Sequence, residues 1–145
     1  MTLFISEKNK KRTLIEWRIY LCISAFVALF SVIYESCSHG VYSRAMVFAF
    51  LYPLLLGALL YLLFHLVPFK TLPGTIPCCV YNLGVALFTT RSIFIGVLQI
   101  YGKTNEKMLL TYTILAIVIY TIGTLLIIYS LIKGNIKKVD KDLNK

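Results

Sequence analysis

Four long apolar stretches fill most of this chain and leave little of it for anything except crossing a membrane. They cover residues 17–34, 45–67, 76–101 and 109–132. Each is about 18 residues or longer, which is enough to cross a hydrocarbon core about 30 Å thick. A mean hydropathy of +0.80 and an apolar share of 59% agree, because a soluble domain is closer to half apolar. The sequence therefore predicts an all-α membrane protein, folded as an antiparallel four-helix transmembrane bundle.

Basic residues are concentrated at the two ends of the chain. Ten of the fifteen lysines and arginines lie there, whereas the loops 35–44 and 102–108 together hold three. Cytoplasmic segments of membrane proteins carry an excess of basic residues, so both termini are predicted to be cytoplasmic. An even number of spans also requires both termini to share one side. Residues 1–16 and 133–145 then form basic cytoplasmic tails around a transmembrane domain of residues 17–132. The ten residues are Lys8, Lys10, Lys11, Arg12, Arg18, Lys133, Lys137, Lys138, Lys141 and Lys145.

A net charge of +9 is typical of a nucleic-acid-binding protein, but its placement here favours a different partner. The positive residues flank the first and last spans, where they meet the anionic headgroups of a cytoplasmic leaflet. We therefore expect the tails to contact the lipid bilayer, and we expect no nucleic-acid partner.

Small and weakly polar residues recur at steps of three and four in every span, which places them along one face of each helix. Helices associate in membranes through such residues, by close packing and by interhelical hydrogen bonds. In the third span, Asn82, Thr89 and Ser92 are predicted to face the bundle interior. These faces either hold the helices together or line a path for a ligand or solute, and both interpretations are open. The remaining members are Ser24, Ala28, Ser31, Glu35, Ala45, Ala49, Pro53, Gly57, Tyr61, His65, Ala86, Gly96, Gln99, Thr113, Ala116, Tyr120, Gly123 and Ser130.

Two residues are unusual within their spans. Pro53 is predicted to kink the second span, because proline removes a backbone hydrogen bond and crowds the preceding turn. Arg91 lies near the middle of the third span, where a charge costs about 2.5 kcal/mol or more. At about 100° per residue it lies half a turn from Asn82, so it is predicted to point away from the polar face. Arg91 either reaches the outer headgroups, or it contacts a partner: a second subunit, a second copy or a lipid phosphate.

The loop after the first span is the densest polar cluster in the chain. Residues 34–44 contain an acid, an imidazole, two phenols and a guanidinium. Such groups can bind an anion, a metal or a proton, and the end of the third span is predicted to lie on the same side. The alternative is an ordinary interfacial turn, whose tyrosines belong to the aromatic belt of the membrane surface. The candidate ligand-binding residues of this outer face are Glu35, His39, Tyr42, Arg44, Gln99 and Tyr101.

The two histidines limit the cofactors that the chain can hold. His39 and His65 lie 26 residues apart at opposite ends of the second span, a distance of about 39 Å along a helix. They cannot both ligate one haem within one chain, so haem is expected only if its ligands are shared between chains. The same separation argues against a zinc site, and no metal site is predicted. The sequence contains no nucleophile–base–acid set and no glycine-rich phosphate loop.

Two segments carry a resemblance to other proteins. Residues 34–43 and residues 96–105 resemble the corresponding parts of small four-span membrane proteins of Gram-positive bacteria. The likeness extends from about residue 16 to residue 132, and the group has no assigned activity. Arg91 departs from the pattern of the group, in which a small residue is expected. The resemblance implies a multi-pass protein of a bacterial cytoplasmic membrane.

These features predict a non-enzymatic integral membrane protein that works as a homo-oligomer or beside a membrane partner subunit. We expect it to bind or pass a small polar species from the outer side. Two alternatives are open. One is a membrane electron-transfer subunit with haem or quinone, using His39 or His65 with a ligand from another chain. The other is a purely structural or assembly factor.

Overall fold

The computed structural model describes residues 2–38, 41–66, 72–102 and 106–143, with side chains from Lys11 to Gly134 within these ranges. Every regular element in the described ranges is a helix, as the sequence predicts. Four helical segments are long and apolar enough to cross a membrane: Lys11–Ser36, Arg44–Leu66, Thr75–Ile100 and Glu106–Gly134. The elements are α1 (Thr2–Ser36), α2 (Arg44–Val47), the π-helix η1 (Tyr52–Ala58), α3 (Leu59–Leu66), α4 (Thr75–Ile100) and α5 (Glu106–Leu143).

The first and last helices extend beyond the predicted membrane boundaries. α1 begins at Thr2 and α5 ends at Leu143, so most of both basic tails is helical. Lysine, glutamate and leucine are good helix formers. Continuing the helix also satisfies the backbone groups that a helix end would leave open. The tails are therefore extensions of the first and last spans.

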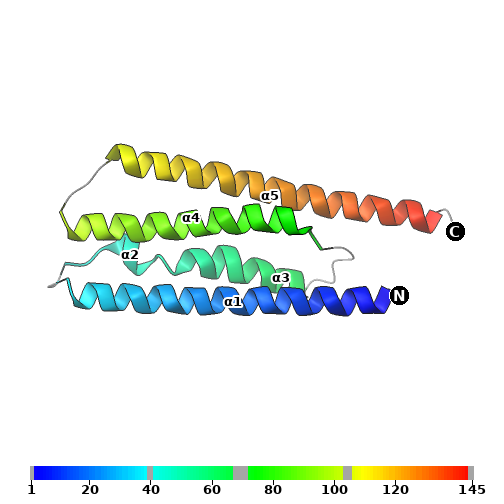
Figure 1. The fold of residues 1–145 in the computed structure, drawn as a ribbon, viewed down its shortest axis with the longest axis horizontal. Coiled ribbons are helices and arrows are strands. Elements are labelled where there is room, and N and C mark those ends of the chain that lie inside the picture. Colours follow the sequence, from blue (N-terminus) through cyan, green and yellow to red (C-terminus); the bar gives the residue numbers. More distant parts are fainter. Residues whose placement is uncertain (1, 39–40, 67–71, 103–105, 144–145) are drawn as a thin grey trace.

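The four spans lie in a row that follows their order in the sequence (Figure 1). α1 packs on η1 and α3, α2 and η1 pack on α4, and α4 packs most extensively on α5. Within the described residues, α1 and α5 share no comparable contact. α1 begins and α5 ends at the same end of the long axis of the bundle (Figure 1). The second span and α4 are the two inner members of the row, so each is packed on two sides.

Two glycines allow α4 and α5 to approach closely. A Cβ atom on Gly84 would lie 2.7 Å from the Cα of Tyr120, and one on Gly123 would lie 2.6 Å from the Cα of Tyr81. The two contacts are reciprocal, since each helix offers one glycine to the backbone of the other. Small residues at such crossings let helices in membranes pack backbone to backbone. Because the obstructing atoms are backbone atoms, even a methyl group would push the helices apart.

The second span is not one continuous α-helix. α2 ends at Val47 and η1 begins at Tyr52, with turns at residues 48–50 between them. Pro53 lies in the first turn of η1 and has no backbone N–H to donate. In a regular α-helix the carbonyl of Ala49 would accept the N–H of residue 53. Here it accepts the backbone N–H of Tyr52, at 3.4 Å. The kink predicted at Pro53 is therefore a full interruption of the helix that begins before the proline.

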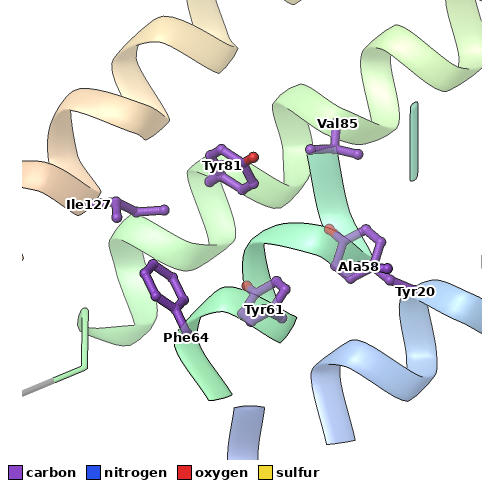
Figure 2. Packing of buried hydrophobic residues seen from close by; sticks show 7 residues of the cluster. All are labelled: Tyr20, Ala58, Tyr61, Phe64, Tyr81, Val85 and Ile127. Atoms are coloured by element: carbon purple, nitrogen blue, oxygen red, sulfur yellow. The ribbon is translucent and has the colours of Figure 1, made fainter. Parts of the chain in front are cut away.

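An aromatic cluster holds the four spans together in the half of the molecule that contains the termini (Figure 2). The rings of Tyr20 and Tyr61 stack with their centroids 5.6 Å apart, and those of Tyr81 and Tyr120 lie 5.2 Å apart. Such pairs contribute about 0.5–1.5 kcal/mol beyond the burial of their area. Every span supplies at least one member, so the cluster fixes how the helices are rotated against one another. Its buried members are Tyr20, Ala58, Tyr61, Phe64, Tyr81, Val85 and Ile127.

Candidate functional site

Hydroxyl groups from α1 and α4 line the second span along most of its length. We call this row of contacts the polar seam. We call the end opposite the chain termini the outer end and the other end the inner end, after the orientation that the sequence predicts. At the outer end Ser43 contacts Gln99, and at the inner end Tyr61 donates to Asn82 at 3.0 Å. Between them, four hydroxyls donate to backbone carbonyls at 2.6–3.0 Å: Ser92 to Ala45, Ser31 to Met46, Ser24 to Phe50 and Tyr81 to Leu56.

The interruption of the second span explains why the carbonyl of Ala45 needs a donor from another helix, whereas the carbonyls of Met46 and Phe50 also accept the backbone N–H groups of Ala49 and Leu54. The backbone N–H of Ala49 donates to Met46 rather than to Ala45, so the carbonyl of Ala45 loses its usual partner within the helix. The hydroxyl of Ser92 donates to that carbonyl at 2.6 Å in its place. An unsatisfied backbone group in the hydrocarbon region costs several kcal/mol, and broken membrane helices persist only where neighbouring groups satisfy it. The hydroxyl of Ser92 thus compensates for the interruption at Ala45, and the other hydroxyls of the seam add donors to carbonyls further along the second span.

The outer end of the polar seam brings together two of the predicted ligand-binding residues, Glu35 and Gln99. Ser43 donates its hydroxyl to Oε1 of Gln99 at 2.6 Å and its backbone N–H to Oε1 of Glu35 at 3.3 Å. Ser43 is only 2% exposed, whereas Glu35 is half-buried and Gln99 is exposed. A carboxylate offers about four acceptor sites. Within the described residues, the carboxylate of Glu35 accepts one hydrogen bond, so its other acceptor sites are available to a ligand.

The structure does not bring the other predicted outer residues into this network. Tyr42 and Tyr101 are 77% and 74% exposed, a placement that fits tyrosines of the interfacial aromatic belt. Arg44 is exposed, and in the described part of the chain no ion pair joins it to Glu35. His39 lies outside the described residues.

The three residues predicted for the bundle interior lie between helices, with different partners. Ser92 is buried and donates to the carbonyl of Ala45 across the α4 interface with the second span. Asn82 is half-buried and accepts the hydroxyl of Tyr61. Thr89 is buried but donates to Val85, one turn earlier in its own helix. Ser92 and Asn82 therefore belong to the polar seam, and Thr89 does not bond across it.

Arg91 points away from the polar seam, as predicted, but the face it occupies is packed. Its Nε donates to the hydroxyl of Thr113 on α5 at 2.5 Å, and that hydroxyl donates in turn to the carbonyl of Leu109. The sequence predicts that the face of α4 around Arg91 is otherwise apolar. In the structure this face packs on α5, because α4 lies between the second span and α5. A guanidinium carries five N–H donors. Within the described residues one of the five has a protein acceptor, so four are available to another group.

Sequence reasoning did not single out Ser43 or the buried tyrosines Tyr20 and Tyr81. Ser43 is the N-cap residue of the second span, a position where serine is common, but its side chain makes no capping hydrogen bond and contacts Gln99 instead. Tyr20 lies four residues before Ser24 and so continues the buried face of α1. Tyr81 lies 18 residues, or five helical turns, before Gln99 and therefore on the same side of α4 as that member of the predicted face. A search limited to small and weakly polar residues on α4 passed over it because its side chain is large.

The described residues contain no group of three histidine, cysteine, aspartate or glutamate side chains that could hold a metal ion. His65 lies at the inner end of α3, with its Nδ1 3.5 Å from the hydroxyl of Thr13 on α1. It is therefore engaged within the chain at the end of the molecule opposite Glu35.

Comparison with known proteins gave no assignment. No family model, no curated protein and no solved structure matches this chain.

Proposed function

We propose that this protein is a non-enzymatic, multi-pass membrane protein that binds or passes a small polar species at the outer end of the polar seam. The observation that carries the proposal is the buried Ser43, which joins Glu35 and Gln99 where the interrupted second span begins. Transporters place substrate and ion sites at broken membrane helices, where backbone and side-chain oxygens converge. The groups available here are a carboxylate, an amide carbonyl and a hydroxyl. Oxygen ligands suit hard cations, so the favoured species is a small cation.

The proposed orientation is an antiparallel bundle in a bacterial cytoplasmic membrane, with both termini in the cytoplasm. The two termini lie at one end of the long axis of the bundle, and ten of the fifteen basic residues belong to that end. Lysine and arginine are retained on the cytoplasmic side of membranes. Glu35, Ser43 and Gln99 would then open to the outside. Large apolar side chains exposed along the spans, such as Phe26 at 69% and Leu125 at 66%, would face lipid.

We expect sodium, potassium or ammonium to raise the unfolding temperature of the purified protein above that measured in choline at equal ionic strength. A cation at a hundred times its dissociation constant stabilises a protein by about 2.7 kcal/mol. Glu35→Gln should abolish the difference, because it removes the charge and keeps the shape. Glu106→Gln is the matched control, since Glu106 is an exposed carboxylate at the same end of the molecule.

The effect should also appear as flux of the same cation into proteoliposomes whose orientation is known. An impermeant thiol reagent reports orientation once Cys22 and Cys79, which are also exposed, are replaced by serine, because Cys37 is exposed at the outer end whereas Cys78, at the other end, is buried. Equal unfolding temperatures in all four cations, together with no flux, would reject the cation site. A Soret band in the purified protein would favour the electron-transfer alternative instead.

We also propose that the protein works beside a second copy or a membrane partner subunit, with Arg91 at the contact. The support is the four N–H donors of Arg91 that lack an acceptor within the described residues. Arg91 lies nine residues from the outer end of α4, about 14 Å deep. An exposed guanidinium edge is costly at that depth unless it meets an acceptor.

Arg91→Leu should weaken this assembly by about tenfold in dissociation constant, because a hydrogen bond to a charged group contributes about 1.5–3 kcal/mol. The measurement is the assembly mass in nanodiscs as protein is diluted. Thr113→Val is the control, since it removes only the acceptor within the chain. Monomers for wild type and Arg91→Leu alike would contradict the proposed contact.

A further inference from the structure

A groove opens between the start of α4 and the last membrane turns of α5, at the end of the molecule that holds the termini. Its volume is about 470 Å³. It lies at the opposite end of the bundle from Glu35, Ser43 and Gln99, so it is separate from the site proposed above. The lining residues are Leu72, Ile76, Pro77, Leu126, Tyr129, Ser130, Lys133 and Gly134.

The groove has an apolar part and a polar part. Leu126 and Ile76 supply aliphatic side chains, and Ile76 is 75% exposed although it is purely hydrocarbon. One turn further along α5, Ser130 accepts the backbone N–H of Gly74 at 3.3 Å, which ties the start of α4 to α5. Lys133 follows at the membrane boundary, with its Nζ 5.7 Å from the centre of the Tyr129 ring. The groove therefore matches a phospholipid along its length, because its apolar part suits acyl chains, and its hydroxyls and ammonium group suit a phosphate headgroup.

The charge around the groove selects among phospholipids. Lys133 is the first charged residue of the C-terminal tail, and Lys137, Lys138 and Lys141 follow it in the sequence of the same helix. The backbone N–H groups at the start of α4 add the positive end of a 26-residue helix on the other side of the groove. Basic pockets between membrane helices on the cytoplasmic side are sites for anionic headgroups.

We infer that this groove is a binding site for one anionic phospholipid. Its acyl chains lie against Ile76 and Leu126, and its phosphate contacts Lys133 and the hydroxyls of Tyr129 and Ser130. Such a lipid would bridge α4 and α5 beyond the last contact of their glycines. The site would make the stability of this helix pair depend on the lipid composition of the inner leaflet.

The test is a lipid titration by native mass spectrometry of the full chain, with phosphatidylglycerol and phosphatidylcholine of identical acyl chains. The readout is the ratio of the two dissociation constants for the first bound lipid. Each lysine near an anionic surface contributes about 1 kcal/mol, which is about fivefold. Wild type should therefore prefer phosphatidylglycerol by about fivefold or more, and Lys133→Gln should remove most of this preference.

Lys11→Gln is the matched control, because Lys11 is an exposed lysine on α1 at the same end of the molecule. Lys11→Gln should keep the preference for phosphatidylglycerol. If Lys11→Gln and Lys133→Gln lose this preference equally, the lipid binds to a diffuse basic surface and not to the groove. Ile76→Ala should weaken the binding of both lipids by a similar factor and leave the ratio of their dissociation constants unchanged. No preference in wild type, no effect of Ile76→Ala, or competition by glycerol 3-phosphate at concentrations equal to the lipid would each overturn the inference.

Discussion

Gly84→Ala and Gly123→Ala are each expected to destabilise the protein by about 2–3 kcal/mol, the upper range for overpacking a tight interface. The added methyl group would stand 2.7 Å from the Cα of Tyr120 or 2.6 Å from the Cα of Tyr81. Neither backbone can move alone, because Tyr81 and Tyr120 also pack their rings against each other. The helices α4 and α5 would have to separate along their whole contact.

The measurement is the free energy of unfolding in mixed micelles, with the loss of contact between α4 and α5 as the signal that reports unfolding. Gly74→Ala is the control, since the nearest atom to its added methyl group is 3.7 Å away, an ordinary contact. Gly84→Ala combined with Gly123→Ala should cost less than the sum of the two, because the separation forced by one substitution makes room for the other. Full additivity, or a cost equal to that of Gly74→Ala, would contradict the close approach.

The triple variant Ser24→Ala, Ser92→Ala, Tyr81→Phe is expected to lose about 3 kcal/mol and to loosen the second span. Each substitution removes a hydroxyl that donates to a carbonyl of that span, at Phe50, Ala45 or Leu56. Interhelical hydrogen bonds in membranes contribute about 0.6–1.7 kcal/mol each. About 1 kcal/mol for each bond gives the expected total, because the carbonyl of Ala45 is left without a donor whereas that of Phe50 still accepts the backbone N–H of Leu54.

Hydrogen exchange of the backbone amides should report where the effect occurs. Amides of α2 and η1 should exchange at least tenfold faster in the triple variant, and those of α5 should change little. Ser36→Ala is the control, since its hydroxyl is exposed and bonds within its own helix to Val32. A triple variant as stable as Ser36→Ala would show that the interrupted span needs no support from its neighbours.

Much of the architecture follows from local properties of the sequence. The length of each apolar stretch predicts a span, and the structure contains four helices of that kind within a few residues of the predicted ends. The small-residue faces of the first, second and fourth spans are largely buried, as at Ser31, Gly57 and Gly123. In the third span, Ala86 is exposed although it belonged to the predicted face. Hydrophobicity and helical period act within one helix, so a sequence displays them directly.

The sequence by itself determined that this chain has four apolar helices, with basic ends and a packing face on each. Only the tertiary structure decided which faces meet. α4 has two packed sides because it lies between two helices, which turns Arg91 toward Thr113 and brings Tyr81 into the core. Ser43 joins Glu35 to Gln99, which follows Ser43 by 56 residues, because three helix ends converge there. Contacts of this kind depend on how separate helices are rotated and ordered in space, and no periodicity within a single helix carries that information.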